Sequence, residues 1–356
     1  MWINVTKTYL PDQEVYKKYI DQIFERWWLT NSWPLVQELE KKLMEYLWVE
    51  NLLLVSNGTI ALQVLYKTLW LKGNVVTTPF SFVATTSSLV WEWLEPKFTD
   101  INQDFLTIDE NKILGTIDDQ TSAILWVHVY GNPCDVEKLE KISKEKNIKL
   151  IFDAAHCFNV KYKWTSILNY WDASILSFHS TKLFHTIEWW AIIFKNKSDL
   201  EKAKLIINFW IETYEKISTV WINGKMNEFQ AAMWLCVLDS IKNNIQKRKN
   251  ISEYYDSALK QEYTSLKWRE WTERNYAYYP IIINTQQRLE EIVEKLNKNE
   301  IYPRKYFKPS LNTINYVNYI HMPISEDISN RILCLPLYES LDFKDVDLIV
   351  KIINDV

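Results

Sequence analysis

Short apolar runs alternate with helical patterns between about residues 50 and 235. The runs are apolar throughout, which is typical of strands that are covered on both faces. Helices between such strands indicate a mostly parallel sheet, because parallel strands need long crossover connections. The pattern therefore predicts an α/β fold. We expect strands at Asn51–Val55, Val75–Thr77, Ala123–Val127, Lys149–Phe152, Ala173–Ser177 and Ala191–Phe194, and helices at Thr59–Leu69, Ser81–Glu92 and Asp135–Glu145.

The pattern changes in the last third of the chain. A long helical pattern runs from Met226 to about Leu259. It is followed by a strand at Tyr278–Ile283, a helix at Gln286–Asn297 and a terminal helix near Lys344–Ile353. This mixture predicts a second, smaller α+β domain. We place the large domain at residues 1–240 and the small C-terminal domain at residues 241–356, which are usual domain sizes.

Composition is that of an ordinary globular protein. Of the 356 residues, 47% are hydrophobic and 24% are charged, which is enough for a sizeable core. A net charge of −4 gives no reason to expect a nucleic-acid partner. No run is apolar for long enough to span a membrane, and charged residues interrupt Met1–Ile20, where a secretory signal would be apolar. We therefore expect a cytoplasmic protein without a membrane partner.

The four cysteines are widely spaced, and none of them forms a CxxC pair. This spacing suits a reducing compartment and argues against a disulfide framework. It also argues against a zinc ribbon. No metal site is expected.

Glycine is scarce in this chain and tryptophan is abundant. Average usage predicts about 25 glycines at this length, whereas the sequence has 5 glycines and 18 tryptophans. Trp48 and Trp70 end helical segments, where a glycine is common. One interpretation is genuine aromatic packing; the other, which agrees better with the positions, is a systematic replacement of glycine by tryptophan. Each tryptophan at a site that needs a positive φ would cost about 1–2 kcal/mol.

A turn with glycine follows the first predicted strand. The sequence Ser56-Asn57-Gly58-Thr59 leads from Asn51–Val55 into a helix. The N–H groups at the start of a helix favour anions, so this turn is a candidate phosphate seat. Thr59 can add its hydroxyl. The alternative is an ordinary helix N-cap, and the turn is not a P-loop because the GK[ST] ending is missing.

Two polar residues follow a predicted strand further along. Asp153 comes directly after three apolar residues, at the carboxyl end where open α/β sheets bind ligands. A carboxylate here could hold a protonated pyridine nitrogen, and His156 could contact the same ring. Phe82, at the start of a predicted helix, could stack on a flat cofactor. The alternatives are a helix N-cap, a packed histidine and a core phenylalanine.

A lysine appears where the chain leaves another strand. Lys182 follows the stretch from Ser174 to Thr181, in which Ser177 ends the strand. A lysine forms a Schiff base only as the neutral amine, so it needs burial or cationic neighbours. A surface lysine is the alternative. The positions of Asp153 and Lys182 at the ends of strands, with a phosphate seat near residue 58, argue against it.

Together these segments resemble the sugar-nucleotide aminotransferases of the DegT/DnrJ/EryC1/StrS family, which are fold type I pyridoxal-phosphate enzymes. The resemblance covers nearly the whole chain, and its most specific part is DAAH followed by SFHSTK. It also runs through VSNGTIAL, TTPFSFVATTSSLV, VHVYGNPCD, INGKMNEFQAAM and YPRKYFKP. The implied fold is a mostly parallel central sheet flanked by helices, with a smaller C-terminal α+β domain.

The resemblance implies a role for each cofactor-side residue. Lys182 would hold pyridoxal 5'-phosphate as a Schiff base and would move protons during turnover, when the cofactor passes through its pyridoxamine form. Asp153 would pair with the pyridine nitrogen, Phe82 would stack on the ring, and His156 would lie beside it. The phosphate would be held by Gly58, Thr59 and Ser177.

The resemblance also implies a homodimer with shared active sites, because Asn223 would reach the phosphate from the neighbouring subunit. The segment from Tyr302 to Pro309 looks like a substrate-side segment. The expected substrate-binding residues are Glu188, Lys225, Met226, Arg304 and Tyr306.

The chain departs from the family pattern mainly at tryptophans. Relatives usually read EGG where this chain has Glu188-Trp189-Trp190, so we expect the two indoles to fill part of the pocket. Lys225 stands where many relatives have arginine. The positions at which glycine would restore the family pattern are 27, 33, 48, 70, 93, 164, 171, 189, 190, 210, 221 and 234.

The implied function is transamination from L-glutamate to C-4 or C-3 of a dTDP-linked keto-6-deoxyhexose, for surface glycans such as lipopolysaccharide. One alternative is a deoxysugar dehydratase on the same scaffold, a subgroup with histidine at the position of Lys182. The other is a catalytically inactive scaffold or regulatory binding protein, if the tryptophans block the site.

Overall fold

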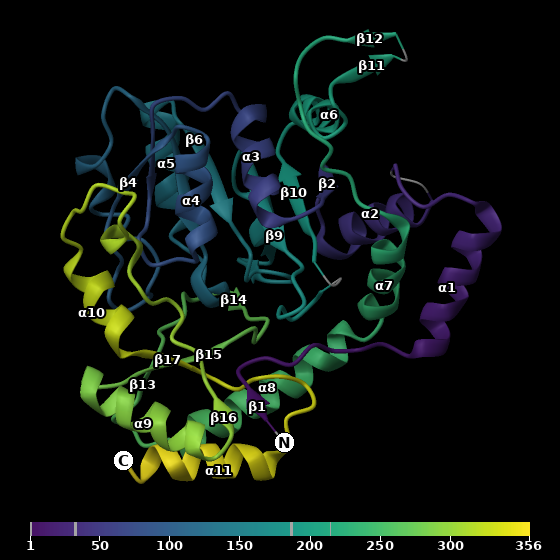
Figure 1. Cartoon of the computed structure of the whole chain (residues 1–356). Coiled ribbons are helices and arrows are strands. Elements are labelled where there is room, and N and C mark those ends of the chain that lie inside the picture. The colour runs from purple at the N-terminus through teal and green to yellow at the C-terminus, as the bar shows by residue number, and fades with distance from the viewer. Residues whose placement is uncertain (1, 32–33, 186–187, 214) are drawn as a thin grey trace.

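The computed structural model describes residues 2–31, 34–185, 188–213 and 215–356. Within these residues, seven strands form a central sheet in the order β2-β10-β9-β6-β5-β3-β4 (Figure 1). β10 is antiparallel to both of its neighbours, and the strands from β9 to β4 are mutually parallel. The predicted mostly parallel sheet is confirmed. Its strands are β2 (Leu52–Val55), β3 (Asn74–Thr77), β4 (Glu95–Phe98), β5 (Thr121–Val127), β6 (Lys149–Asp153), β9 (Ala173–Ser177) and β10 (Trp190–Phe194).

Helices cover both faces of this sheet, because successive side chains of each strand enter different cores. Leu53 and Val55 pack into one core, and Leu52 and Leu54 pack into the other. The first core is closed by α3 (Gly58–Thr68), α4 (Val83–Trp91) and α6 (Lys197–Ile206). The second is closed by α2 (Pro34–Leu47), α5 (Val136–Lys146) and α7 (Glu228–Leu238).

A smaller three-stranded sheet follows the central one. It has the order β13-β15-β17 and its own hydrophobic core, which includes Ile3 near the N-terminus. Ile3 enters this core because β1 (Ile3–Asn4) pairs in parallel with β16 (Ile301–Tyr302). The other elements are β13 (Thr264–Ser265), β15 (Tyr279–Ile282), β17 (Ile332–Leu335), α9 (Gln286–Lys298), α10 (Pro323–Arg331) and α11 (Phe343–Asn354).

The single long helix that the pattern predicts near residue 226 is wrong. The structure has two helices there, α7 and α8 (Ile241–Ala258), with a break at Asp239 and Ser240. Almost all of α7 packs into the core of the central sheet, whereas Ile251 and Tyr255 of α8 pack into the smaller core. The chain turns as it leaves the core of the central sheet, to which Ile241 at the start of α8 still belongs, for the smaller core. A continuous apolar and helix-forming sequence does not reveal such a turn.

The remaining elements lie at the edges of the body. The hairpin of β11 (Ile211–Thr213) and β12 (Lys216–Ile217) projects away from the central sheet, and α1 (Gln13–Arg26) packs against α7 (Figure 1). Short strands β7 (Lys161–Tyr162), β8 (Thr165–Ser166) and β14 (Thr272–Glu273) form a small sheet. Single 3-10 turns lie at Ile113–Gly115, Val129–Gly131, Ile167–Asn169 and Leu311–Thr313. None of the helices described is both long and apolar enough to cross a bilayer.

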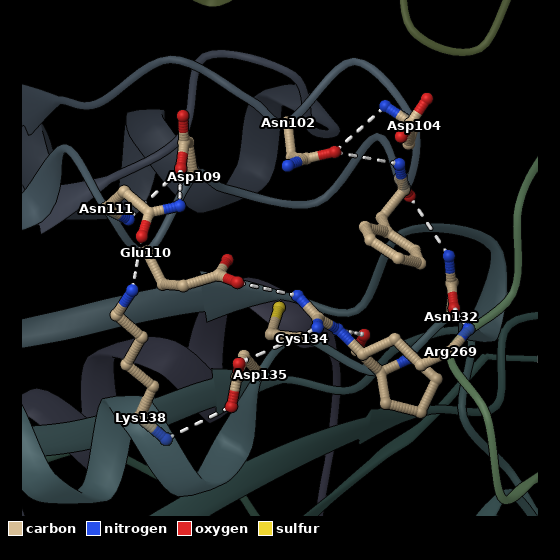
Figure 2. A network of polar contacts seen from close by, with 12 residues as sticks. Asn102, Asp104, Asp109, Glu110, Asn111, Asn132, Cys134, Asp135, Lys138 and Arg269 are labelled. Atoms are coloured by element: carbon tan, nitrogen blue, oxygen red, sulfur yellow. Dashed lines mark hydrogen bonds and ion pairs between the residues drawn. The ribbon is translucent and has the colours of Figure 1, made fainter.

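A half-buried arginine fixes the segment before β14 to the loops of the central sheet. Figure 2 shows Arg269 among these loops. Its Nη2 donates to Glu110 Oε1 at 3.1 Å, and its Nε donates to the carbonyl oxygen of Pro133 at 2.9 Å. Asn132 Nδ2 donates to the carbonyl oxygens of Phe105 and Lys267. These contacts place the following residues against the carboxyl ends of the central strands.

The tryptophans at the expected glycine positions divide into two groups. Trp33 lies outside the described residues. Six others have left-handed backbone, with φ between 53° and 68°: Trp27, Trp48, Trp70, Trp93, Trp164 and Trp210. The remaining five, Trp171, Trp189, Trp190, Trp221 and Trp234, do not. Trp271, with φ 62°, adopts the same conformation and is missed by the sequence analysis. The demand for glycine is therefore a backbone property at the first group alone.

Candidate active site

A cavity of about 670 Å³ lies at the carboxyl ends of β6 and β9. β10 runs antiparallel to β9, so its first residue lies at the same edge as their last residues. The side chains of Asp153, Ser177 and Trp190 also point to one face of the sheet, because of the strand pairing and the alternation of side chains along each strand. The residues that line the cavity include Asn57, Gly58, Thr59, Ser81, Phe82, Asp153, His156, Ser177, His179, Lys182, Glu188, Trp190, Tyr278, Tyr306 and Phe307.

Asp153 is held by a chain of hydrogen bonds. The backbone N–H of Ala155 donates to its Oδ1 at 3.1 Å, and the Thr85 hydroxyl donates to its Oδ2 at 2.9 Å. Ser81 Oγ lies 2.8 Å from Thr85 Oγ1; since Thr85 already donates to Asp153, Ser81 donates to Thr85. Burial raises the pKa of Asp153, and these hydrogen bonds and the charge of Lys182 oppose the rise. The carboxylate is oriented before any ligand arrives.

Lys182 directs its amine into the cavity. The turn after β9 is closed by its own N–H, which donates to the carbonyl oxygen of His179 at 2.8 Å. Its Nζ donates to the hydroxyl of Tyr278 at 3.1 Å. Burial lowers the pKa of Lys182 to about 8, although Asp153 and Tyr306 act in the opposite direction. Far more of this amine is therefore neutral near neutral pH than in an ordinary lysine, and the neutral form is the nucleophile.

His156 forms one wall of the cavity. Its Nδ1 accepts a hydrogen bond from the backbone N–H of Tyr130 at 3.0 Å, so the proton of the neutral ring lies on Nε2. Its ring stacks on Phe307, with centroids 5.9 Å apart, and contacts Tyr278 at 4.7 Å. Burial lowers the pKa of His156 well below its ordinary value, and the charge of Lys182 adds to this effect. The ring is neutral at physiological pH.

The opposite end of the cavity is the start of α3. Asn57 caps this helix by accepting the N–H of Ile60 at 2.9 Å. Gly58 and Thr59 form its first turn, where N–H groups have no partner within the helix. The ordinary N-cap and the candidate phosphate seat are thus the same turn. Ser177, which is buried, lines the cavity nearby.

The predicted substrate-binding residues are divided by the structure. Glu188 and Tyr306 line the cavity, together with Phe82, which is 58% exposed at the start of α4. Of the predicted substrate-binding residues, Lys225, Met226 and Arg304 do not line it, and neither does Asn223, which is predicted to bind the cofactor phosphate. Met226 is buried in the core, and Lys225 Nζ donates to Asn208 Oδ1 at 2.8 Å. Asn223 is exposed and forms an isolated β-bridge with Asn208. Arg304 is exposed and forms another with Cys334 of β17.

Sequence reasoning misses several residues of this site. Thr85 lies 68 residues before Asp153, and Tyr278 lies 96 residues after Lys182. Neither carries a motif, because a threonine in a helix and a tyrosine before a strand are ordinary. Arg269 and Asn275, which fix the segment leading to Tyr278, also belong to no motif. Asn275 Nδ2 donates to the carbonyl oxygens of His156 and Phe158.

The arrangement suits a flat ring that carries both a basic nitrogen and an electrophilic carbon with which the lysine amine can react. The Lys182 amine is a nucleophile, and Asp153 is a carboxylate for a protonated ring nitrogen. The helix start offers N–H donors to a phosphate group. These residues fit pyridoxal phosphate at the ring end of the cavity. At the phosphate end, the Trp190 indole packs against Gly58.

Comparison with known proteins agrees with this arrangement. The model of the DegT/DnrJ/EryC1/StrS aminotransferase family matches residues 12–354. A dTDP-4-amino-4,6-dideoxy-D-glucose transaminase of Shigella dysenteriae is 36% identical, over 99% of this chain and 99% of that protein. The match includes the central sheet, the β13-β15-β17 sheet and all residues that line the cavity.

Two solved structures share the fold. DesI, crystallised in the presence of its TDP-sugar product, superposes with a TM-score of 0.94 at 25% identity, over 99% of this chain and 92% of that chain. Spr1654 of Streptococcus pneumoniae in its PLP form superposes with a TM-score of 0.89 at 21% identity, over 98% of this chain and 97% of that chain.

Proposed function

The chain belongs to the DegT/DnrJ/EryC1/StrS aminotransferase family, and from this premise we propose that it transfers the amino group of L-glutamate to a dTDP-linked keto-6-deoxyhexose. The amination takes place at C-4, because the Shigella relative is named for a 4-amino-4,6-dideoxyglucose. Amination at C-3 is the other expectation from the sequence. We place the enzyme in the cytoplasm, in the synthesis of surface glycans such as lipopolysaccharide.

The observation that carries this proposal is the pairing of Lys182 and Asp153 across one cavity. A half-buried lysine with its pKa lowered to about 8 stands opposite a carboxylate that is already oriented by Thr85 and Ala155. Few reactions need both groups at the two ends of a flat ring. Transamination with pyridoxal 5'-phosphate does.

Pyridoxal 5'-phosphate, when bound, supplies an electron sink for the carbon that carries the amino group. Lys182 would hold the cofactor covalently, and its released amine would move the proton of the donor's Cα as general base and then as acid. Asp153 would keep the ring nitrogen protonated. His156 and Phe82 would hold the ring between them. Gly58, Thr59 and Ser177 would bind the phosphate.

The substrate side of the proposal involves a second subunit. Glu188 and Tyr306 line the cavity and would face the sugar. Asn223, Lys225, Met226 and Arg304 do not line the cavity of their own chain. We propose a homodimer in which Asn223 reaches the partner's phosphate, while Lys225, Met226 and Arg304 bind the nucleotide sugar. The exposure of Asn223 supports this proposal.

The direct test is an assay with purified protein, L-glutamate and dTDP-4-keto-6-deoxyglucose. We expect 2-oxoglutarate and a dTDP-4-amino sugar in equal amounts, with the position of the new amine read by NMR. A parallel assay uses the dTDP-linked 3-keto sugar. If only this substrate is aminated, at C-3, the reaction takes place at the neighbouring carbon. Release of water from the sugar without amine transfer would favour the dehydratase instead.

The two alternatives have less support. The dehydratase subgroup has histidine where this chain has Lys182, and the Shigella relative is named a transaminase. The inactive scaffold depends on the tryptophans blocking the site. Trp189 is buried in the core and does not line the cavity, so the expectation that both indoles fill the pocket is wrong for this residue.

A further inference from the structure

Trp190 stands between the two segments that would bind the phosphate. It begins β10 and pairs with Ser177 of β9 on one side and with Val55 of β2 on the other. Val55 leads directly into the turn that contains Gly58. Residues directly opposite each other on neighbouring strands point to the same face of a sheet. The Trp190 side chain therefore lies on the face of Ser177, beside the start of α3.

The indole rests directly on Gly58. A β-carbon added to Gly58 would lie 2.4 Å from Cε2 of Trp190 and 2.6 Å from Cζ2. Real β-carbons do not approach other atoms so closely, so only glycine is compatible with the indole at this point. The indole thus packs on the backbone of the first turn of α3, whose N–H groups would bind an anion, and its own Nε1 lies 2.9 Å from the same β-carbon position.

We propose that Trp190 fills part of the phosphate pocket and weakens the binding of the phosphate group of the cofactor. This inference rests on the proposed function. A phosphate needs several donors within hydrogen-bond distance, and the indole, which offers a single N–H, occupies space beside a helix turn that offers more of them. Trp190 is the residue that determines how deeply the phosphate enters, whereas the ring end, with Lys182 and Asp153, is unaffected.

Trp189 gives an internal contrast. The two tryptophans are adjacent in sequence, yet alternation sends them to opposite faces of the sheet. Trp189 is 5% exposed and belongs to the core that α2, α5 and α7 close. Trp190 packs against the other core and lines the cavity. The restriction is therefore specific to one position and one face.

The test compares two ligands that differ only in the phosphate. Cofactor-free wild type, Trp190→Gly and Trp190→Ala are titrated with pyridoxal 5'-phosphate and with pyridoxal, following the absorbance of the Lys182 adduct. We expect both variants to bind pyridoxal 5'-phosphate at least about tenfold more tightly than wild type. Their affinity for pyridoxal should change by less than about twofold. Trp190→Ala guards against a loss of affinity caused by the flexibility of a glycine at the first residue of β10.

The matched control is Trp93→Gly, the same chemical change at the far end of α4 from Phe82. Trp93 is 93% exposed and does not line the cavity, so neither affinity should change. If the Trp190 variants bind pyridoxal 5'-phosphate no more tightly than wild type, or gain equally for both ligands, the inference about Trp190 is wrong and the proposed function stands. If no variant binds pyridoxal 5'-phosphate at all, both are overturned.

Discussion

The two ends of the cavity are built in different ways. At the ring end, side chains from β6, the turn after β9 and the segment before β15 meet with their hydrogen bonds already made. At the phosphate end, the groups offered to a ligand are backbone N–H groups together with the hydroxyls of Thr59 and Ser177, and the side chain of Trp190 packs against Gly58. A site made of side chains keeps its geometry, whereas a site made of backbone depends on the absence of a side chain.

This difference separates chemistry from affinity. The residues that would move protons, Lys182 and Asp153, are in place and have pKa values shifted by burial. The residue that would limit cofactor affinity is Trp190. Its neighbours in the described part of the chain are Val55, Gly58 and Ser177. We therefore expect changes at the ring end to alter turnover, and changes at the phosphate end to alter binding.

The largest effect is expected from Lys182→Ala. Loss of the amine removes both the covalent link and the proton carrier, so turnover should fall by about 10³-fold or more. Initial rates of 2-oxoglutarate formation measure this loss, and circular dichroism checks the fold. Lys144→Ala, an exposed lysine on α5, serves as the control and should keep wild-type rates. Turnover within tenfold of wild type would exclude Lys182 as the proton carrier.

The pH dependence of Lys182 is the next largest effect. Only the neutral amine reacts with trinitrobenzenesulfonate, and burial lowers the pKa of Lys182 to about 8. Labelling of this residue in the cofactor-free protein should therefore rise with pH around a midpoint near 8. In unfolded protein the midpoint should return to about 10.4. Asp153→Asn should shift the midpoint below 8, because it removes a negative charge that favours the ammonium form. A midpoint near 10.4 in the folded protein would contradict the burial of the amine.

Asp153→Asn should reduce turnover by about 10²-fold, since a neutral amide cannot hold a protonated ring nitrogen. The asparagine side chain has nearly the same shape as that of aspartate, so the melting temperature of this variant should stay close to that of wild type. Thr85→Val, which removes only the hydrogen bond to Oδ2, should have a smaller effect of the same sign. Equal rates for wild type and Asp153→Asn would remove the carboxylate from the mechanism.

Much of the fold can be predicted from the sequence, and less of the site. Continuous apolar runs at Ala123–Val127 and Ala173–Ser177 predict strands correctly because both faces are buried. Asp153 and Lys182 are found because they follow strands at the carboxyl edge. The hydrogen-bond chain through Thr85, the approach of Tyr278, and the register that sends Trp190 into the cavity depend on pairings between distant segments. No local pattern encodes such pairings.

Tyr278→Phe should have a moderate effect. It removes the hydroxyl that contacts Lys182 Nζ at 3.1 Å but keeps the ring against His156. A hydrogen bond of this kind contributes about 0.5–1.5 kcal/mol, so kcat should fall by about three- to tenfold. As a positioning residue, Tyr278 should affect kcat more than KM for L-glutamate. An increase in KM with kcat unchanged would show that it contacts the substrate instead.

The smallest effect concerns the left-handed tryptophans, which lie away from the site. Trp93 has φ 60° and is 93% exposed, so it pays the cost of this backbone without burying its ring. Trp93→Gly should raise the free energy of unfolding by about 1 kcal/mol, measured by urea denaturation. Trp93→Ala keeps a β-carbon and should not give this gain. Equal stability of the two variants would show that the indole, not the backbone, is responsible.

The covalent attachment of the cofactor tests the central claim most directly. The protein is incubated with pyridoxal 5'-phosphate, reduced with borohydride, digested, and its peptides are identified by mass spectrometry. We predict a single stoichiometric phosphopyridoxyl group on Lys182, and none on that peptide when L-glutamate has first converted the cofactor to its amine form. Label spread over surface lysines, or absent from Lys182, would contradict the account.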